Sequence, residues 1–122
     1  MINYITLGTN DFDRAVRFYD ELLPHMGAAR AFATERWVAW SFGEGATMLC
    51  VVKPFDEEPA TGGNGTMVAL KVTSHEEVDD MHRRALSLGA VDEGSPGFRG
   101  KSFYGGYFRE LDGNKLNFFC YE

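Results

Sequence analysis

Cysteine is scarce in this sequence, and long apolar runs are absent. The chain of 122 residues contains only two cysteines, Cys50 and Cys120, and both lie in apolar, strand-like segments. A free thiol in such a segment behaves as a small hydrophobic side chain, and disulfides are rare in reducing compartments. No segment approaches the ~18 consecutive apolar residues of a membrane span, and the N-terminus lacks a signal-peptide pattern. We therefore expect core thiols, no membrane partner and a cytoplasmic location.

Positive charge is also in short supply. Twelve Lys and Arg residues face eighteen Asp and Glu residues, which leaves a net charge of -6, and the basic residues are scattered along the chain. Binding to a phosphate backbone requires concentrated positive charge, so nucleic acid is not an expected partner.

The hydrophobic content of 44% and the aromatic content of 14% are sufficient for the packed core of a single domain spanning residues 1–122.

The same pattern of elements occurs twice along the chain. Residues 4–8 alternate as in a strand, and an amphipathic helix is predicted from Phe12 to about Met26. A second strand-like segment at residues 67–72 precedes a second predicted helix at residues 75–88. Three β-rich segments follow each helix: residues 28–33, 37–42 and 47–52 in the first half, and residues 90–93, 103–109 and 115–121 in the second.

This repetition predicts an α+β fold of two tandem βαβββ modules, residues 1–53 and 66–122. Residues 54–65 lack periodicity and contain proline, acidic residues and glycine, so we expect a linker with no chemistry of its own. Each helix hides one face of a curved, mixed sheet. The modules must therefore pair, or exchange with another chain, to enclose the other face. We expect a half-open barrel with its helices outside, a cleft within it, and a homodimer.

Two motifs support a family resemblance that covers nearly the whole chain. The first is D-x-x-R-A-x-x-F-Y at residues 11–19, directly after the first strand, and the second is the D-G-N turn at residues 112–114. Such a turn is common by itself. Together with the repeat, the motifs resemble the vicinal oxygen chelate superfamily, which includes glyoxalases, bleomycin-resistance proteins and dioxygenases.

The resemblance implies a divalent metal bound by residues of the first and last strands of each half. The positions that match are Tyr4, Met67 and Asn117, and the fourth lies within residues 47–52, which contain no His, Asp or Glu. A phenol, a thioether and an amide supply no charge to offset the desolvation of a divalent ion. The three histidines fall on the predicted helices. We therefore expect no metal of the family type and no cofactor.

Strand alternation places other side chains beside these positions. Thr6 shares the face of Tyr4, and Phe119 shares the face of Asn117. A few polar groups among apolar walls are typical of a ligand site. The alternative is that Tyr4, Met67 and Asn117 simply fill the interior and hydrogen-bond to one another.

The glycine-rich segment at residues 94–107 has the most unusual composition in the chain. As a lid, its Arg99, Tyr104 and Tyr107 would close over an anionic or aromatic compound, and Arg109 would share the face of Tyr107. An ordinary loop, with Arg109 in a surface salt bridge near Glu110, is the alternative.

Trp37 and Trp40 are predicted on opposite faces of their strand, with one of them in the core.

Three hypotheses for the function follow. The first is a metal-free relative that binds a small, aromatic or anionic molecule in the cleft. The second is a lyase, isomerase or dioxygenase of the same superfamily with atypical or metal-independent catalysis, in which Tyr4 and Asn117 would stabilise a developing oxyanion. The third is an interaction protein whose cleft is filled.

Overall fold

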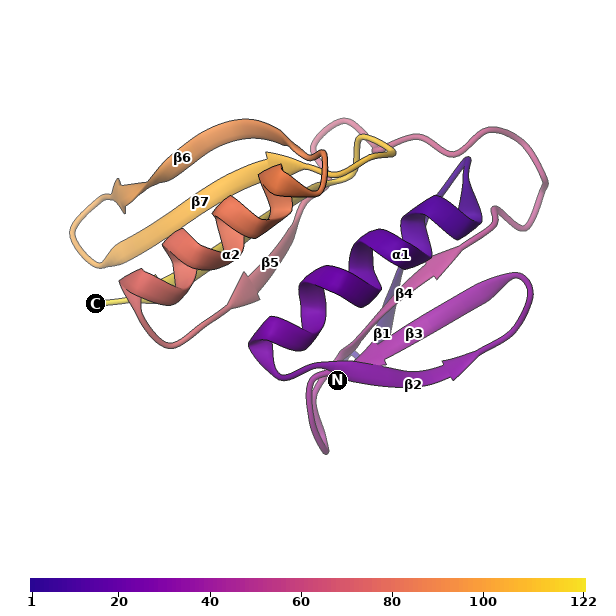
Figure 1. Ribbon diagram of the computed structural model, residues 1–122, viewed down its shortest axis with the longest axis horizontal. Helices are drawn as coiled ribbons and strands as arrows, with labels where there is room; N and C mark the ends of the chain where they lie inside the picture. Colours follow the sequence, from indigo (N-terminus) through magenta and orange to yellow (C-terminus); the bar gives the residue numbers. More distant parts are fainter. The chain divides into compact units, whose positions relative to one another are not determined.

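The computed structural model describes residues 1–122, and the chain divides into two compact units, Met1–Gly62 and Gly63–Glu122. Each unit contains one helix and a four-stranded mixed sheet, in the order β-α-β-β-β along the chain (Figure 1). The fold class is therefore α+β with two βαβββ modules, as the repeat predicts. No helix has the length and apolar character needed to cross a membrane.

In the first unit the strand order is β1-β4-β3-β2, with β1 parallel to β4 and the other neighbours antiparallel. Because β1 and β4 are parallel, a crossover joins them, and α1 is the helical part of that connection. The elements are β1 (Tyr4–Gly8), α1 (Phe12–Leu22), a 3-10 turn η1 (Leu23–Met26), β2 (Ala29–Ala33), β3 (Trp37–Ser41) and β4 (Met48–Val52).

Helix α1 covers one face of this sheet. Asp11 caps its N-terminus by accepting a hydrogen bond from the backbone N–H of Arg14. The α-helix ends at Leu22, earlier than predicted, because Pro24 has no backbone N–H to continue the ladder; residues 23–26 form a 3-10 turn closed by Gly27 at φ 86°. The buried side chains of the helix are Ala15, Phe18, Tyr19 and Leu22.

Trp40 and Trp37 lie on opposite faces of β3, as alternation predicts. Trp40 is buried, packs on Tyr19 with the ring centroids 5.4 Å apart, and donates its indole N–H to Asp20 at 2.9 Å. Trp37 is only partly buried and shares its face with the side chains of β1 that point away from the helix.

The second unit repeats the plan with strand order β5-β8-β7-β6 and with β5 parallel to β8. Its elements are β5 (Val68–Lys71), α2 (His75–Ser87), β6 (Val91–Arg99), β7 (Phe103–Arg109) and β8 (Lys115–Tyr121). Ser74 caps α2 by accepting from the N–H of Glu77, whose carboxylate in turn accepts from the backbone N–H of Thr73. The fully buried side chains of this core include Val78, Met81, Phe108, Leu116 and Phe118.

The glycine-rich segment differs from its prediction as a lid or loop. Strand β6 continues through it to Arg99, so only residues 100–102 form the connection to β7. The register of β6 against β7 shifts between Asp92 and Gly94 and again between Gly94 and Gly97. Gly94 has a φ of 154°, which side chains rarely allow, so glycine lets the strand bulge and still pair.

Candidate functional site

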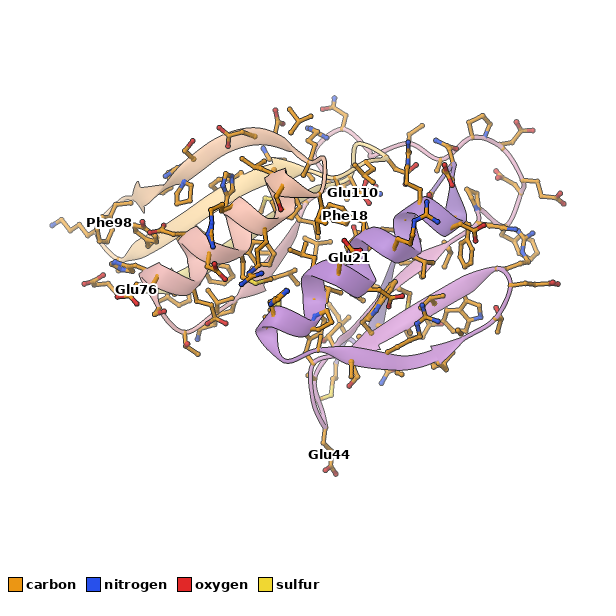
Figure 2. The ribbon with its side chains drawn as sticks, viewed as in Figure 1. Phe18, Glu21, Glu44, Glu76, Phe98 and Glu110 are labelled. Carbon is orange, nitrogen blue, oxygen red and sulfur yellow. The ribbon has the colours of Figure 1, made fainter.

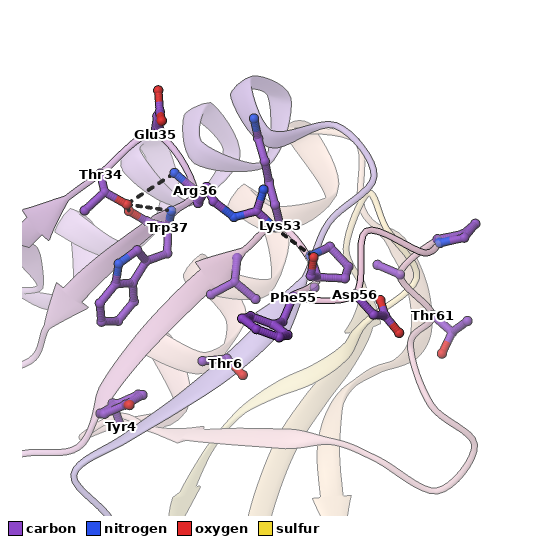
Figure 3. Close-up of a pocket in the computed structure, with 15 residues that line it drawn as sticks. Tyr4, Thr6, Thr34, Glu35, Arg36, Trp37, Lys53, Phe55, Asp56 and Thr61 are labelled. Atoms are coloured by element: carbon purple, nitrogen blue, oxygen red, sulfur yellow. Dashed lines mark hydrogen bonds between the residues drawn. The ribbon is translucent and has the colours of Figure 1, made fainter.

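The open face of the first sheet, opposite α1, contains a groove of about 1040 Å³ (Figure 3). Tyr4, Thr6 and Gly8 of β1 line it together with Trp37 of β3 and Val52 of β4. Tyr4 and Thr6 point into the groove because they alternate with Ile5 and Leu7 along the strand. The size falls at the upper end of the range for small-molecule pockets.

Aromatic rings form one wall of the groove. The ring centroids of Tyr4 and Trp37 are 6.0 Å apart, and Phe32 meets Trp37 edge-to-face at 4.5 Å. Tyr4 remains 49% exposed, and Phe55, at the mouth of the groove, is 99% exposed. A flat ligand placed in the groove would remove these rings from water.

Residues 53–61, here called the strap, return over the end of the groove. Asn10 holds the strap through two hydrogen bonds to the backbone of Ala60, accepting from its N–H at 2.7 Å and donating to its carbonyl oxygen at 3.1 Å. Arg36 donates to the carbonyl oxygen of Pro54 at 3.0 Å. A Cβ at Gly8 would lie 2.9 Å from the Cβ of Ala60, so only glycine fits beneath the strap.

The rim of the groove carries charges of both signs. Arg36 and Lys53 lie beside Glu35 and Asp56, and none of these four forms an ion pair within the chain. Lys53 instead lies over the ring of Phe12, 5.4 Å from its centroid. The charge balance at this rim therefore favours neither anions nor cations.

The face of the second sheet opposite α2 holds four of the residues predicted for the site. Tyr107 of β7 pairs directly with Asn117 of β8, and Gly105 pairs with Phe119, so these side chains share one face. Arg99 lies over the ring of Tyr107, 5.3 Å from its centroid. Asn117 is fully buried, and neither its amide nitrogen nor its amide oxygen has a hydrogen-bond partner.

The other three predicted residues of the second unit make contacts outside this group. Tyr104 is on the face covered by α2, where its hydroxyl donates to Asp79 at 2.7 Å. This hydrogen bond raises the pKa of Tyr104 above its usual value. Arg109 lies on the same face of β7 as Tyr107, as alternation predicts, but it pairs with Glu93 at 2.8 Å and not with Glu110, the partner considered from the sequence. Met67 precedes β5 and is 42% exposed.

Residues 54–61 of the strap belong to the linker for which the sequence predicts no chemistry. Arg36, Lys53 and Phe55 all line the groove. Phe55 is the one signal in the sequence that indicates this contribution. It is an apolar ring in a polar, proline-containing linker, and such a linker has no core of its own in which to bury the ring.

The residues that the sequence matches to the family's metal positions are weak ligands for a divalent ion. Thr6 pairs with Cys50 in the first sheet as Ala69 pairs with Asn117 in the second, so Cys50 is the repeat equivalent of Asn117. Cys50 is fully buried, and this burial raises the pKa of its thiol, which disfavours the thiolate that binds metal. No three His, Cys, Asp or Glu side chains converge anywhere in the chain. Tyr4, Cys50, Met67 and Asn117 thus supply no charged ligand.

The comparisons with known proteins agree with the fold and the repeat. The family model of the Glyoxalase/Bleomycin resistance protein/Dioxygenase superfamily matches residues 1–118. The chain therefore belongs to this superfamily.

Several solved structures are similar to the chain. A glyoxalase/bleomycin resistance protein from Albidiferax ferrireducens T118 is 30% identical, with a TM-score of 0.91 over 100% of this chain and 99% of that one. Lactoylglutathione lyase from Agrobacterium tumefaciens is 20% identical, with a TM-score of 0.73 over 98% and 92% of the two chains. A glyoxalase/bleomycin resistance protein/dioxygenase family enzyme from Burkholderia phytofirmans PsJN is 15% identical, with a TM-score of 0.80 over 98% of each chain. No curated protein matches the chain.

Proposed function

We propose that this member of the superfamily binds a small organic molecule without a metal of the family type. The observation that carries the proposal is the open groove of the first unit, lined by Tyr4, Thr6 and Trp37. The residues that the sequence matches to the family's metal positions, Tyr4, Met67 and Asn117, are neither carboxylate nor imidazole. An interaction protein with a filled interior would have no such groove.

The chemistry of the lining suits binding better than catalysis. Trp37 and Tyr4 offer apolar ring faces, while the hydroxyls of Tyr4 and Thr6 can orient a polar group of the ligand. The carboxylates of Glu35 and Asp56 lie at the exposed rim, where a general base gains little from desolvation. Turnover by an atypical lyase, isomerase or dioxygenase is the alternative outcome of the test below.

We extend the proposal to the second unit and to the protein's surroundings. Four predicted residues, Arg99, Tyr107, Asn117 and Phe119, share one face of its sheet and are proposed as further ligand contacts. The buried, free thiols of Cys50 and Cys120 suit the cytoplasm. We propose a homodimer as the working form.

Tryptophan fluorescence tests the groove directly, because Trp37 lines it and Trp40 lies on the other face of the sheet. We expect neutral aromatic probes such as indole and quinoline to quench the protein saturably, and Trp37→Phe to abolish the change. Trp40→Phe is the matched control, since it removes a tryptophan without touching the groove. Tyr4→Ala should weaken binding about tenfold, which corresponds to roughly 1.4 kcal/mol.

Two results would overturn the proposal. One is the absence of saturable binding by any aromatic probe up to about 1 mM, where the binding free energy is only about -4 kcal/mol. The other is chemical conversion of a bound compound, followed by chromatography, which would restore the enzyme hypothesis.

A further inference from the structure

Asn117 has a buried side-chain amide with no hydrogen-bond partner. Its side chain is 0% exposed and makes no hydrogen bond through either amide atom. An unpartnered buried amide costs about 1–3 kcal/mol, and native proteins keep few of them. Tyr107, Lys115 and Phe119 share its face of the sheet and are only partly buried, so a ligand can reach the surface beside the amide.

Cations without acidic partners surround the same position. Arg99 lies 5.3 Å and Lys115 lies 5.5 Å from the ring centroid of Tyr107, the residue paired with Asn117. Arg99 donates only to the carbonyl oxygen of Ser95, and neither cation forms an ion pair. In a chain of net charge -6, both cations thus stay without a neutralising carboxylate, and a bound anion would lower their mutual repulsion.

The rest of this face is aromatic and also lacks free acids. Phe103 and Phe119 stack with their centroids 5.0 Å apart, and Lys71 lies over the ring of Tyr121 at 5.5 Å. The carboxylate of Glu93, on the neighbouring strand β6, is already paired with Arg109. Cation–π contacts are weak, so the positive charges stay available to a stronger partner.

Building on the proposed function, we propose that this face of the second sheet selects an anionic aromatic ligand, one that carries a carboxylate or a phosphate. Arg99 and Lys115 neutralise its charge, the amide of Asn117 donates to its oxygen atoms, and Tyr107 and Phe119 contact its ring. A guanidinium suits this task because its planar array of N–H donors matches both carboxylate and phosphate oxygens. The groove rim of the first unit, with both signs of charge, would add no such selectivity.

Nuclear magnetic resonance on the full chain, labelled with ¹⁵N, tests this proposal because side-chain amides give their own signals. The probes are benzoate, phenyl phosphate, uncharged benzyl alcohol and cationic benzylamine. We expect benzoate or phenyl phosphate to shift the Asn117 amide signals saturably, with at least tenfold weaker effects from the other two. The preference between the two anions identifies which of them the site takes.

Charge-removing variants connect the binding to the named residues. Arg99→Gln and Lys115→Gln should each weaken binding of the preferred anion about five- to tenfold. Lys101→Gln is the matched control, because it removes the same charge from the exposed turn between β6 and β7. If Arg99→Gln disturbs the β6 bulge, Lys115→Gln alone still decides the outcome.

The failure of this inference can be told apart from the failure of the proposed function. Equal binding of benzyl alcohol and benzoate, or equal weakening by Lys101→Gln, would overturn the anion site and leave small-molecule binding intact. An absence of binding by all four probes, together with no quenching by indole or quinoline, would overturn both.

Discussion

At the scale of single residues, Asn117 links stability to the proposed function. Replacing it by Leu, which has a similar branched shape, removes a buried amide that has no partner. We predict that Asn117→Leu raises the free energy of unfolding in urea by about 1 kcal/mol and abolishes the shifts that benzoate causes in the backbone amide signals of neighbouring residues. A fall of more than 1 kcal/mol would show that the amide is satisfied in the folded protein.

Asn10 provides the contrast for that substitution. Both of its amide atoms bind the backbone of Ala60, so Asn10→Leu should lower stability, by about 1 kcal/mol, under the same conditions. An equal gain from the two variants would mean that the substitution to Leu, and not the missing partner, causes the change.

Asp92 predicts an acid-sensitive contribution to stability. Hydrogen bonds from the backbone N–H of Gly94, the Ser95 hydroxyl and the His82 ring hold the pKa of Asp92 below its usual value. A lowered pKa in the folded state stabilises the fold above the unfolded value of about 3.9, and that contribution disappears as the pH falls through the folded value.

We therefore predict that Asp92→Asn flattens the loss of stability between about pH 5 and pH 3, measured by urea unfolding at each pH. Glu44→Gln is the control, because Glu44 projects from the turn between β3 and β4 and makes no hydrogen bond (Figure 2). Identical profiles of unfolding free energy against pH for wild type and Asp92→Asn would contradict a lowered pKa of Asp92 in the folded protein.

At the scale of elements, the sequence predicted the strands and helices well and their irregularities poorly. The apolar periodicity around Phe18 and Met81 identified both helices, because each has a buried face that repeats every turn. Periodicity could not reveal that β6 continues to Arg99, since its bulges break the alternation on which a strand prediction depends.

The strap gives a prediction at this scale. Gly8→Ala would bring two Cβ atoms to 2.9 Å and push the strap away, so the amide of Ala60 should exchange its hydrogen about tenfold faster. The double variant Gly8→Ala, Ala60→Gly removes one of the two clashing atoms and should restore slow exchange. Persistence of fast exchange in the double variant would show that the contact with Ala60 does not hold the strap.

At the scale of the whole molecule, the candidate site was only partly predictable. Alternation placed Tyr4 with Thr6, and Asn117 with Phe119, because side chains two apart on a strand share a face. Phe55 lines the groove only because the strap folds back over the first sheet. The hydrogen bonds between Asn10 and Ala60, fifty residues apart along the chain, hold the strap in that position. No local pattern encodes such a contact.

The exposed apolar side chains support a prediction about assembly. Tyr4, Phe55, Met67 and Phe98 are among the large apolar groups left in water, and such groups commonly mark an interaction surface. We predict that sedimentation equilibrium gives twice the chain mass of 13.6 kDa. A mass equal to that of one chain at all concentrations would contradict the homodimer.

The central claim is that this superfamily member binds its ligand without a metal of the family type. Its most direct test is the metal content of protein purified without chelators or affinity tags, followed by calorimetric titration with zinc, nickel, manganese and iron. The account predicts near-zero occupancy and no heat at stoichiometric ion, because Tyr4, Cys50, Met67 and Asn117 supply no charged ligand. Tight binding of one ion per chain would contradict it and make a metal-dependent enzyme the leading account.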